Sequence, residues 1–264
     1  MANYEIVHIA IAPPDTLDAN LVRNVAAVIN KSPYDTRLLL AGQIPKIIAH
    51  CQSMQVAESM AQRLRDLALL AIVCKDSELH TPSLTFMAHT MEFREGEVVF
   101  WDKGGQERRM ESSNVFLILK GRKHTYTEEE KTDTKMKFSL PATVLTGGIP
   151  IWRRVRQQTK DTSLQSEYFM RLYDRKPWET SVEMLQGQMN YSMLGTEMTF
   201  SSLTNFSTLA AKLREILPQA IFDDRLVKPS GVSASSSRVS EDVETNCKLI
   251  YLFYLVTRGL DSTA

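Results

Sequence analysis

The chain has 264 residues, of which 43% are hydrophobic and 23% charged, and its 31 basic residues balance 31 acidic ones. These values are typical of globular proteins and exclude a collagen-like, fully disordered or cysteine-scaffold protein. A formal net charge of zero supplies no long-range field that would gather nucleic acid or anionic lipid. The length favours two ordinary domains over one large domain.

Residues 1–80 have the pattern of a compact α/β unit. A β-rich segment from Glu5 to Ala12 ends before two prolines, which cannot continue a strand ladder. Asp15 is then expected to cap a first helix, and Ser32 a second one. We therefore expect the chain to open with one strand followed by two helices.

The rest of this unit completes an alternating pattern. Residues 45–51 predict a second strand, Ser53 is expected to cap a third helix, and residues 69–74 predict a third strand. The predicted order is β-α-α-β-α-β. Three strands covered on one face by three helices form a two-layer sandwich with a single core.

A series of short motifs runs through residues 25–75. Its members are Gly42, Pro45-Lys46-Ile47-Ile48, Ser53, Ala57-Glu58, Leu64 and Ala71-Ile72-Val73. The series resembles the C-terminal domain of bacterial ribosomal protein L7/L12, which has the same β-α-α-β-α-β order. The resemblance implies the fold of that domain for residues 1–80. It does not imply the translational GTPase partner, because residues 29–34 lack the Gly-Leu-Gly turn of the family.

A second region, residues 83–227, is first β-rich and then helical. Strands are expected at residues 85–89, 97–101, 106–110, 115–119, 168–173 and 181–191, the last two as a hairpin. The polar stretch 121–137 indicates a solvated loop, and a helix is expected from Thr204 or Asn205 to Pro218. This mostly antiparallel β domain is similar in architecture to a pleckstrin-homology-type barrel.

The end of the sequence predicts a linker and an apolar helix. Residues 228–240 contain six serines and indicate a flexible linker, and residues 241–264 contain the helix. A helix that is apolar all round is normally buried on most sides. We expect it to fill the second domain, with docking on another chain as the alternative. The candidate docking residues are Leu249, Tyr251, Leu252, Phe253 and Leu255.

Motifs that would indicate catalysis are missing from the sequence. There is no phosphate-binding loop, nucleophile elbow, His-Glu-x-x-His or Cys-x-x-Cys, so neither a catalytic residue nor a metal or cofactor is expected. His50 and Cys51 are neighbours on a predicted strand and point to opposite faces, so they are not expected to act as base and nucleophile. Cys74 and Cys247, like Cys51, stand among apolar residues and indicate buried thiols in a reducing compartment.

Two groups of charged residues give the remaining indications of a functional or structural role. The strongest is a basic group beside a tryptophan, formed by Trp152, Arg153, Arg154, Arg156 and Lys160. This candidate interaction surface suits stacking on a base, phosphate binding or a protein interface, and the alternative is an ordinary solvated strand. The stretch Asp223-Asp224-Arg225 is expected to form a salt bridge and a cap in a loop, with an acidic catalytic pair as the alternative.

Taken together, these patterns predict a two-domain α+β protein of the cytoplasm. The N-terminus lacks the features of a signal peptide, and no apolar run is long enough to span a bilayer. The expected function is a non-enzymatic protein-interaction or scaffolding module that binds another protein or forms a homo-oligomer. The alternatives are an RNA- or ribosome-associated factor that uses the arginine group, and an enzyme with a site between the domains.

Overall fold

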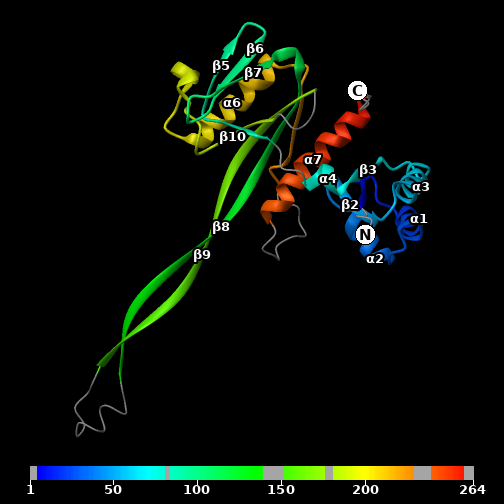
Figure 1. Cartoon of the computed structure of the whole chain (residues 1–264), viewed down its shortest axis with the longest axis horizontal. Helices are drawn as coiled ribbons and strands as arrows, with labels where there is room; N and C mark the ends of the chain where they lie inside the picture. The colour runs from blue at the N-terminus through cyan, green and yellow to red at the C-terminus, as the bar shows by residue number, and fades with distance from the viewer. Residues whose placement is uncertain (1–4, 81–83, 139–151, 176–180, 229–238, 259–264) are drawn as a thin grey trace. The chain divides into compact units, whose positions relative to one another are not determined.

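The computed structural model describes residues 5–80, 84–138, 152–175, 181–228 and 239–258. They form two compact units, one made of residues 1–123 and 167–264 and the other of residues 124–166 (Figure 1). The boundary that the sequence predicts at residues 80–83 stays a prediction, because residues 81–83 lie outside the described part of the chain. The protein is a mixed α+β structure with several sheets.

The first unit begins with the predicted β-α-α-β-α-β order. Its elements are β1 Val7–Ile11, α1 Ala19–Ile29, α2 Pro33–Leu40, β2 Lys46–Cys51, α3 Met54–Arg65 and β3 Ala71–Lys75, followed by the short helix α4 Asp76–His80. The strands form a sheet in the order β2-β1-β3, and the central strand β1 is antiparallel to both neighbours. The L7/L12-like fold itself stays a prediction.

Helix caps explain where the first helices begin. Ser32 caps α2 as predicted: its hydroxyl accepts from the backbone N–H of Asp35 and donates to the Asp35 carboxylate, which is a reciprocal cap. The predicted cap of α1 is wrong, because Asp18 rather than Asp15 accepts two backbone N–H groups of the first turn. Ser53 precedes α3 as predicted but makes no side-chain cap hydrogen bond.

Both faces of the N-terminal sheet are covered. One face packs against α1, α2 and α3 through residues such as Ile9, Val25 and Leu64, which are less than 1% exposed. The opposite face, which includes Ala10 and Ile72, packs against α4 and the C-terminal helix. A strand buried on both faces has no polar alternation, and all five residues of β1 are buried. The predicted two-layer sandwich therefore gains two further helices, α4 and the C-terminal helix, on its second face.

Two more sheets belong to the second half of the chain. Their strands are β4 Phe86–Ala88, β5 Thr90–Arg94, β6 Glu97–Trp101, β7 Glu107–Glu111, β8 Val115–Phe138, β9 Trp152–Asp174, β10 Ser181–Leu185 and β11 Ile221–Leu226. The larger sheet has the order β11-β8-β9-β10-β4, and the smaller one the order β5-β6-β7. The pairs β10–β4 and β11–β8 are parallel, so the larger sheet is mixed. A pleckstrin-homology-type barrel stays a prediction.

Helix α6 Ser202–Ile216 covers these sheets. Its N-cap is Ser201, so the helix starts two residues before the earlier of the two predicted positions. Phe206, Leu209 and Leu213 are fully buried on it and pack with residues of both sheets, such as Phe100. The helix that the sequence predicts before Pro218 is confirmed, and its buried apolar residues face one core.

Two predicted loops are strands. Residues 121–137 were expected to be a solvated loop because they are polar, but they belong to β8. Strand hydrogen bonds use the backbone, so a polar sequence can still pair. Asp223 and Arg225 lie in β11 rather than in a loop, and they form the predicted ion pair at 2.6 Å.

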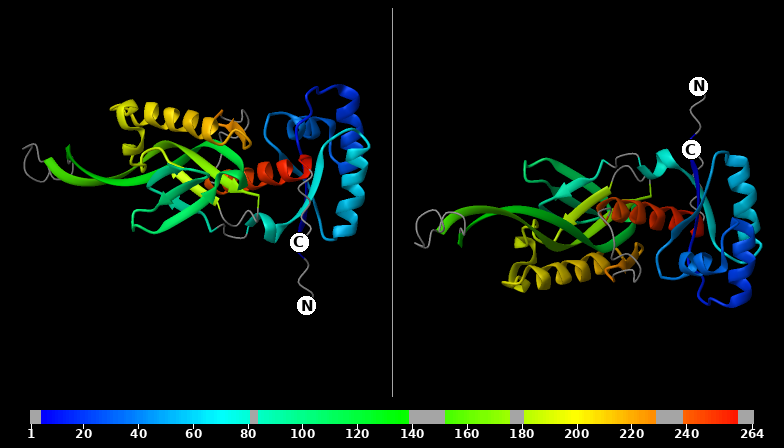
Figure 2. Two further views of the ribbon diagram at one scale, coloured as in Figure 1. Left: turned by 90° about the horizontal axis from the view of Figure 1, so that it is seen from above. Right: turned by 90° about the horizontal axis from the view of Figure 1, so that it is seen from below.

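The C-terminal helix α7, Val239–Thr257, packs between the N-terminal sheet and the larger sheet (Figures 1 and 2). Leu249 and Phe253 contact the face of the N-terminal sheet that carries Ile72. On the other side of the helix, the Tyr251 ring stacks on Tyr173 of β9 with centroids 4.9 Å apart. Among the described residues, no helix has both the length and the apolar character needed to cross a membrane.

We expect Tyr251→Ala to lower the free energy of unfolding by about 3 kcal/mol or more, because it empties a fully buried aromatic site. Val256→Ala, on the same helix but 53% exposed, should change it by less than about 0.5 kcal/mol. Urea denaturation followed by circular dichroism measures both. Equal effects of the two substitutions would show that α7 is not packed as described.

Candidate functional site

The predicted basic surface lies on one strand. Trp152, Arg153, Arg154, Arg156 and Lys160 all belong to β9, in the part of the strand that forms the second compact unit. Their side chains lie outside the described part of the structure. The structure therefore places this group on a strand, and its contacts stay a prediction.

The predicted docking helix contacts other parts of its own chain. Leu249, Tyr251 and Phe253 are buried, at 2%, 2% and 4% exposure, and Leu252 and Leu255 are partly buried. The sequence predicts that this helix fills the second domain, with docking on another chain as the alternative. In the described structure the helix fills the space between the N-terminal sheet and β8–β9.

The three cysteines are buried and unpaired, as their apolar surroundings predict. Burial raises the pKa of Cys74 and Cys247 to about 12 and raises the pKa of Cys51. A thiolate, rather than a thiol, is the nucleophile and metal ligand. These side chains are therefore inert thiols at neutral pH.

One cluster of side chains stands out that the sequence analysis did not predict. It consists of His8 on β1, His50 on β2, and Asp76 and His80 on α4. His8 and His50 are paired directly across the two strands, and α4 begins immediately after β3 on the other side of β1. Within α4, residues 76 and 80 are one turn apart and so lie on the same side of the helix. We call these four residues the His–Asp cluster.

The contacts of the His–Asp cluster centre on His8, which is 4% exposed. Its Nε2 lies 2.8 Å from Asp76 Oδ1, and its Nδ1 lies 2.7 Å from Nδ1 of His50. His80 Nδ1 lies 3.1 Å from the same Asp76 oxygen. The His80 side chain is 59% exposed and that of Asp76 41%. The cluster is therefore buried at His8 and open to solvent at Asp76 and His80.

Hydrogen-bond donors and acceptors fix the tautomers of the cluster. An ionised Asp76 can only accept, so Nε2–H of His8 donates to it. In a neutral His8 the other nitrogen, Nδ1, must then accept, and Nδ1–H of His50 donates to it. The result is a chain of hydrogen bonds that runs from His50 through His8 to the carboxylate.

Electrostatics support the protonation states of Asp76 and His50. The hydrogen bond from His8 is the main reason why the pKa of Asp76 lies below its ordinary value, so this carboxylate is ionised at neutral pH. Partial burial, followed by the nearby His8 and Lys31, lowers the pKa of His50, so this ring is neutral at the same pH. The cluster thus holds one carboxylate and a neutral His50 at pH 7.

The sequence analysis missed this cluster because its members are far apart in the chain. His8 and His50 are separated by 42 residues, and His8 and Asp76 by 68. A usable signal was present: His8 is a polar residue inside an otherwise apolar strand. Only the strand order β2-β1-β3 reveals which residues flank it.

A second polar group is a buried ion-pair network between strands and α7. The Arg171 side chain is 3% exposed, and its guanidinium donates to Glu183 Oε2 at 2.5 and 2.9 Å and to Glu244 Oε1 at 2.9 Å. Lys123 also pairs with the buried Glu183. These bonds tie β8, β9 and β10 to α7, and each buried charge has a partner, which is the arrangement that burial requires.

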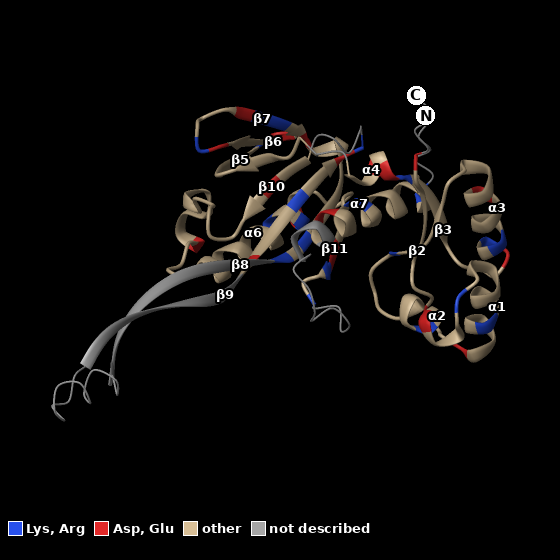
Figure 3. Cartoon of the chain, turned by 60° about the horizontal axis from the view of Figure 1, so that its bottom comes forward, with Lys and Arg blue, Asp and Glu red and all other residues tan. Residues whose placement is uncertain are grey.

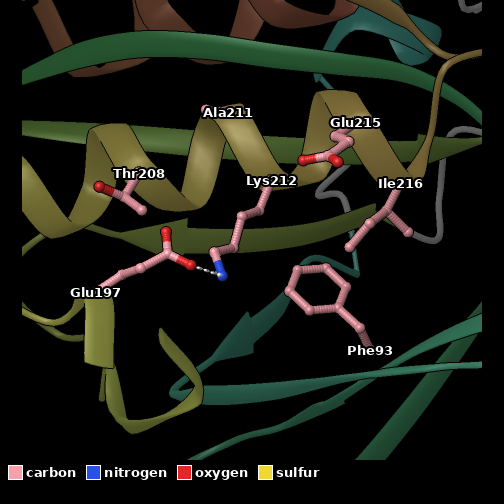
Figure 4. A pocket seen from close by; sticks show the side chains of 7 residues that line it. All are labelled: Phe93, Glu197, Thr208, Ala211, Lys212, Glu215 and Ile216. Carbon is pink, nitrogen blue, oxygen red and sulfur yellow. Dashed lines mark ion pairs between the residues drawn. The ribbon is translucent and has the colours of Figure 1, made fainter. Parts of the chain in front are cut away.

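The described surface also has a hollow beside α6. A shallow hollow of about 340 Å³ is lined by Phe93 and Glu197 and by Thr208, Ala211, Lys212, Glu215 and Ile216 of α6 (Figure 4). Lys212 is paired there with Glu197 at 2.6 Å. Acidic and basic side chains both occur on α3 (Figure 3), where Glu58 and Arg65 form an exposed pair.

Comparisons of the chain with protein-family profiles, curated proteins and solved structures found no match. The resemblance of residues 25–75 to the L7/L12 C-terminal domain therefore stays a prediction.

We expect Arg171→Met to destabilise the protein by about 3–5 kcal/mol, because it leaves the Glu183 carboxylate buried beside only one partner. The double variant Arg171→Met/Glu183→Leu should recover most of this loss, since no unpaired buried charge remains. Chemical denaturation measures both variants, with Arg94→Met in an exposed pair as the control. A double variant no more stable than the single one would contradict this account of the network.

Proposed function

We propose that this chain is a non-enzymatic protein-interaction module of the cytoplasm, and that residues 124–138 and 152–166 form its contact arm. The observation that carries the proposal is the length of two strands. Strands β8 and β9 have 24 and 23 residues, whereas their neighbours β11 and β10 have 6 and 5. We call residues 124–138 of β8 and 152–166 of β9 the ribbon.

The ribbon has the geometry of a binding element. The described pairing of β8 with β11 ends at Gly121, and that of β9 with β10 starts at Phe169. Beyond these points each ribbon strand has only the other strand as a described neighbour. A two-stranded hairpin is marginally stable by itself, and its outer edges present free backbone groups. A partner that covers a face or an edge of the ribbon would stabilise it.

The charge of the ribbon favours a protein partner over RNA. Residues 124–138 hold four acidic residues and three lysines, whereas residues 152–166 hold three arginines, one lysine and one aspartate. A strand that gathers phosphates should lack acidic neighbours, and the run Glu128-Glu129-Glu130 opposes such binding. A mixed ribbon that includes Trp152 and three arginines suits a protein interface, where tryptophan and arginine are enriched.

Two features of the larger unit, residues 1–123 and 167–264, support a non-enzymatic role in a reducing compartment. All three cysteines are unpaired, and burial raises the pKa of each thiol, which disfavours nucleophilic catalysis. The shallow hollow beside α6 is open, and its lysine is already paired with Glu197. Ligand sites are usually deeper and bury most of the ligand surface.

Removal of the ribbon tests the proposal. In this variant Asn-Gly replaces residues 124–166 and joins β8 to β9 as a tight turn. We expect the remaining unit to keep its melting temperature, because its cores lie outside the ribbon. We expect the full chain to capture a discrete protein from nuclease-treated native lysate and the variant to lose it.

A photo-crosslinking residue at Gln157 on β9 should mark the same protein, while the same residue at Arg63 on α3 should not. The triple change Arg153→Glu/Arg154→Glu/Arg156→Glu should weaken capture without altering melting. Light scattering tests whether the partner is a second copy of the chain. Capture that survives removal of the ribbon, or that is lost on nuclease treatment, would contradict the proposal.

A further inference from the structure

We propose that the His–Asp cluster is a binding site for a single Zn²⁺ ion, with His8 Nε2, Asp76 Oδ1 and His80 Nδ1 as the ligand atoms and His50 as the residue that orients His8. These three ligand atoms lie within 4.8 Å of one another. The proposal is independent of the proposed interaction function, because the cluster and the ribbon belong to different compact units.

The distances suit a small tetrahedral ion. Zinc binds imidazole nitrogen and carboxylate oxygen at about 2.0–2.2 Å, so two ligand atoms of a tetrahedral site lie about 3.3 Å apart. Here His8 Nε2 and Asp76 Oδ1 are 2.8 Å apart, and His80 Nδ1 and Asp76 Oδ1 are 3.1 Å apart. Small rotations of the two exposed side chains on α4 would open these distances to the required value.

The ligand types favour zinc over the hard cations. Imidazole suits zinc and other transition metals, whereas calcium and magnesium prefer sites made of oxygen atoms. Three protein ligands leave a fourth tetrahedral position for water. The exposure of the Asp76 and His80 side chains, 41% and 59%, places that position at the surface and gives the ion a path of entry.

His50 supplies the outer contact that zinc-bound histidines usually have. A zinc-bound imidazole commonly donates its other N–H to an acceptor, which fixes the orientation of the ring. The Nδ1 of His50 lies 2.7 Å from Nδ1 of His8 and can accept this hydrogen bond. The buried position of His8 keeps its ring in place, so the ligand nearest the core is oriented before the ion binds.

Zinc binding would reverse the hydrogen-bond chain. In the metal-free cluster Nε2–H of His8 and Nδ1–H of His80 both face the Asp76 carboxylate, which can only accept, whereas the metal-bound form needs a free lone pair on each of these nitrogens. The proton of His8 then lies on Nδ1 and is donated to Nδ1 of His50, whose own proton lies on Nε2. The neutral His8 and His50 rings each change from one tautomer to the other, and the proton of a neutral His80 moves from Nδ1 to Nε2, so the number of protons on the three rings stays the same.

The test is Zn²⁺ titration of the full chain against a chromophoric chelator, together with melting temperatures with and without Zn²⁺. We expect one Zn²⁺ per chain and an increase in melting temperature, because an ion that binds only the folded state stabilises it. His80→Gln and Asp76→Asn should each weaken binding at least about tenfold and abolish the increase in melting temperature. Matched controls are His124→Gln and Asp66→Asn, which lie outside the cluster.

Variants of His50 separate an orienting role from direct ligation. His50→Phe removes the acceptor and should weaken Zn²⁺ binding about 10–100-fold, whereas His50→Gln keeps an acceptor oxygen and should restore most of the affinity. Nitrogen chemical shifts of the histidine rings report the tautomer of His8 directly. Absence of Zn²⁺ binding by the wild-type chain, or binding that His80→Gln and Asp76→Asn leave unchanged, would overturn the proposal.

Discussion

Burial of the apolar C-terminal helix α7 is the interaction on which the larger compact unit depends. Leu249 and Phe253 complete the second face of the N-terminal sheet, while Ile250 and Tyr251 pack against β8 and β9. A helix that contacts two sheets removes apolar area from water on both sides, which stabilises the two sheets together. Polar contacts add specificity to this packing, because the Arg171 guanidinium donates to Glu244 on the helix.

The same helix determines where the His–Asp cluster stands. Helix α4 is only five residues long, too short to be stable by itself. Its Leu79 is buried against Leu249 and Phe253, and the carbonyl of Leu79 accepts a hydrogen bond from Lys248 Nζ at 2.7 Å. This anchoring holds Asp76 and His80 next to the buried ring of His8. The C-terminal end of the chain thus positions a cluster made entirely of N-terminal residues.

Local patterns predicted much of the fold and little of the cluster. Helical spacing and the Ser32 cap predicted α2 and the core of α6, because caps and amphipathic faces depend on residues close in sequence. The strand character of residues 121–137 was missed, since the pairing partner on β9 lies beyond any local window. His8 and His50 meet only through strand order. The apolar character of α7 predicted its burial, but not that it would contact both sheets.

Native-state hydrogen exchange measured at increasing denaturant concentration tests most directly whether α7 joins the two sheets into one cooperative unit. If α7 joins the two sheets, the backbone amides of β3 and of β10 should open with the same free energy, because the two sheets unfold as one cooperative unit. Amides of β3 that open at a clearly lower free energy, while those of β10 stay protected, would contradict the account. That result would show that the N-terminal sheet unfolds separately from the larger sheet, and that α7 does not couple the two.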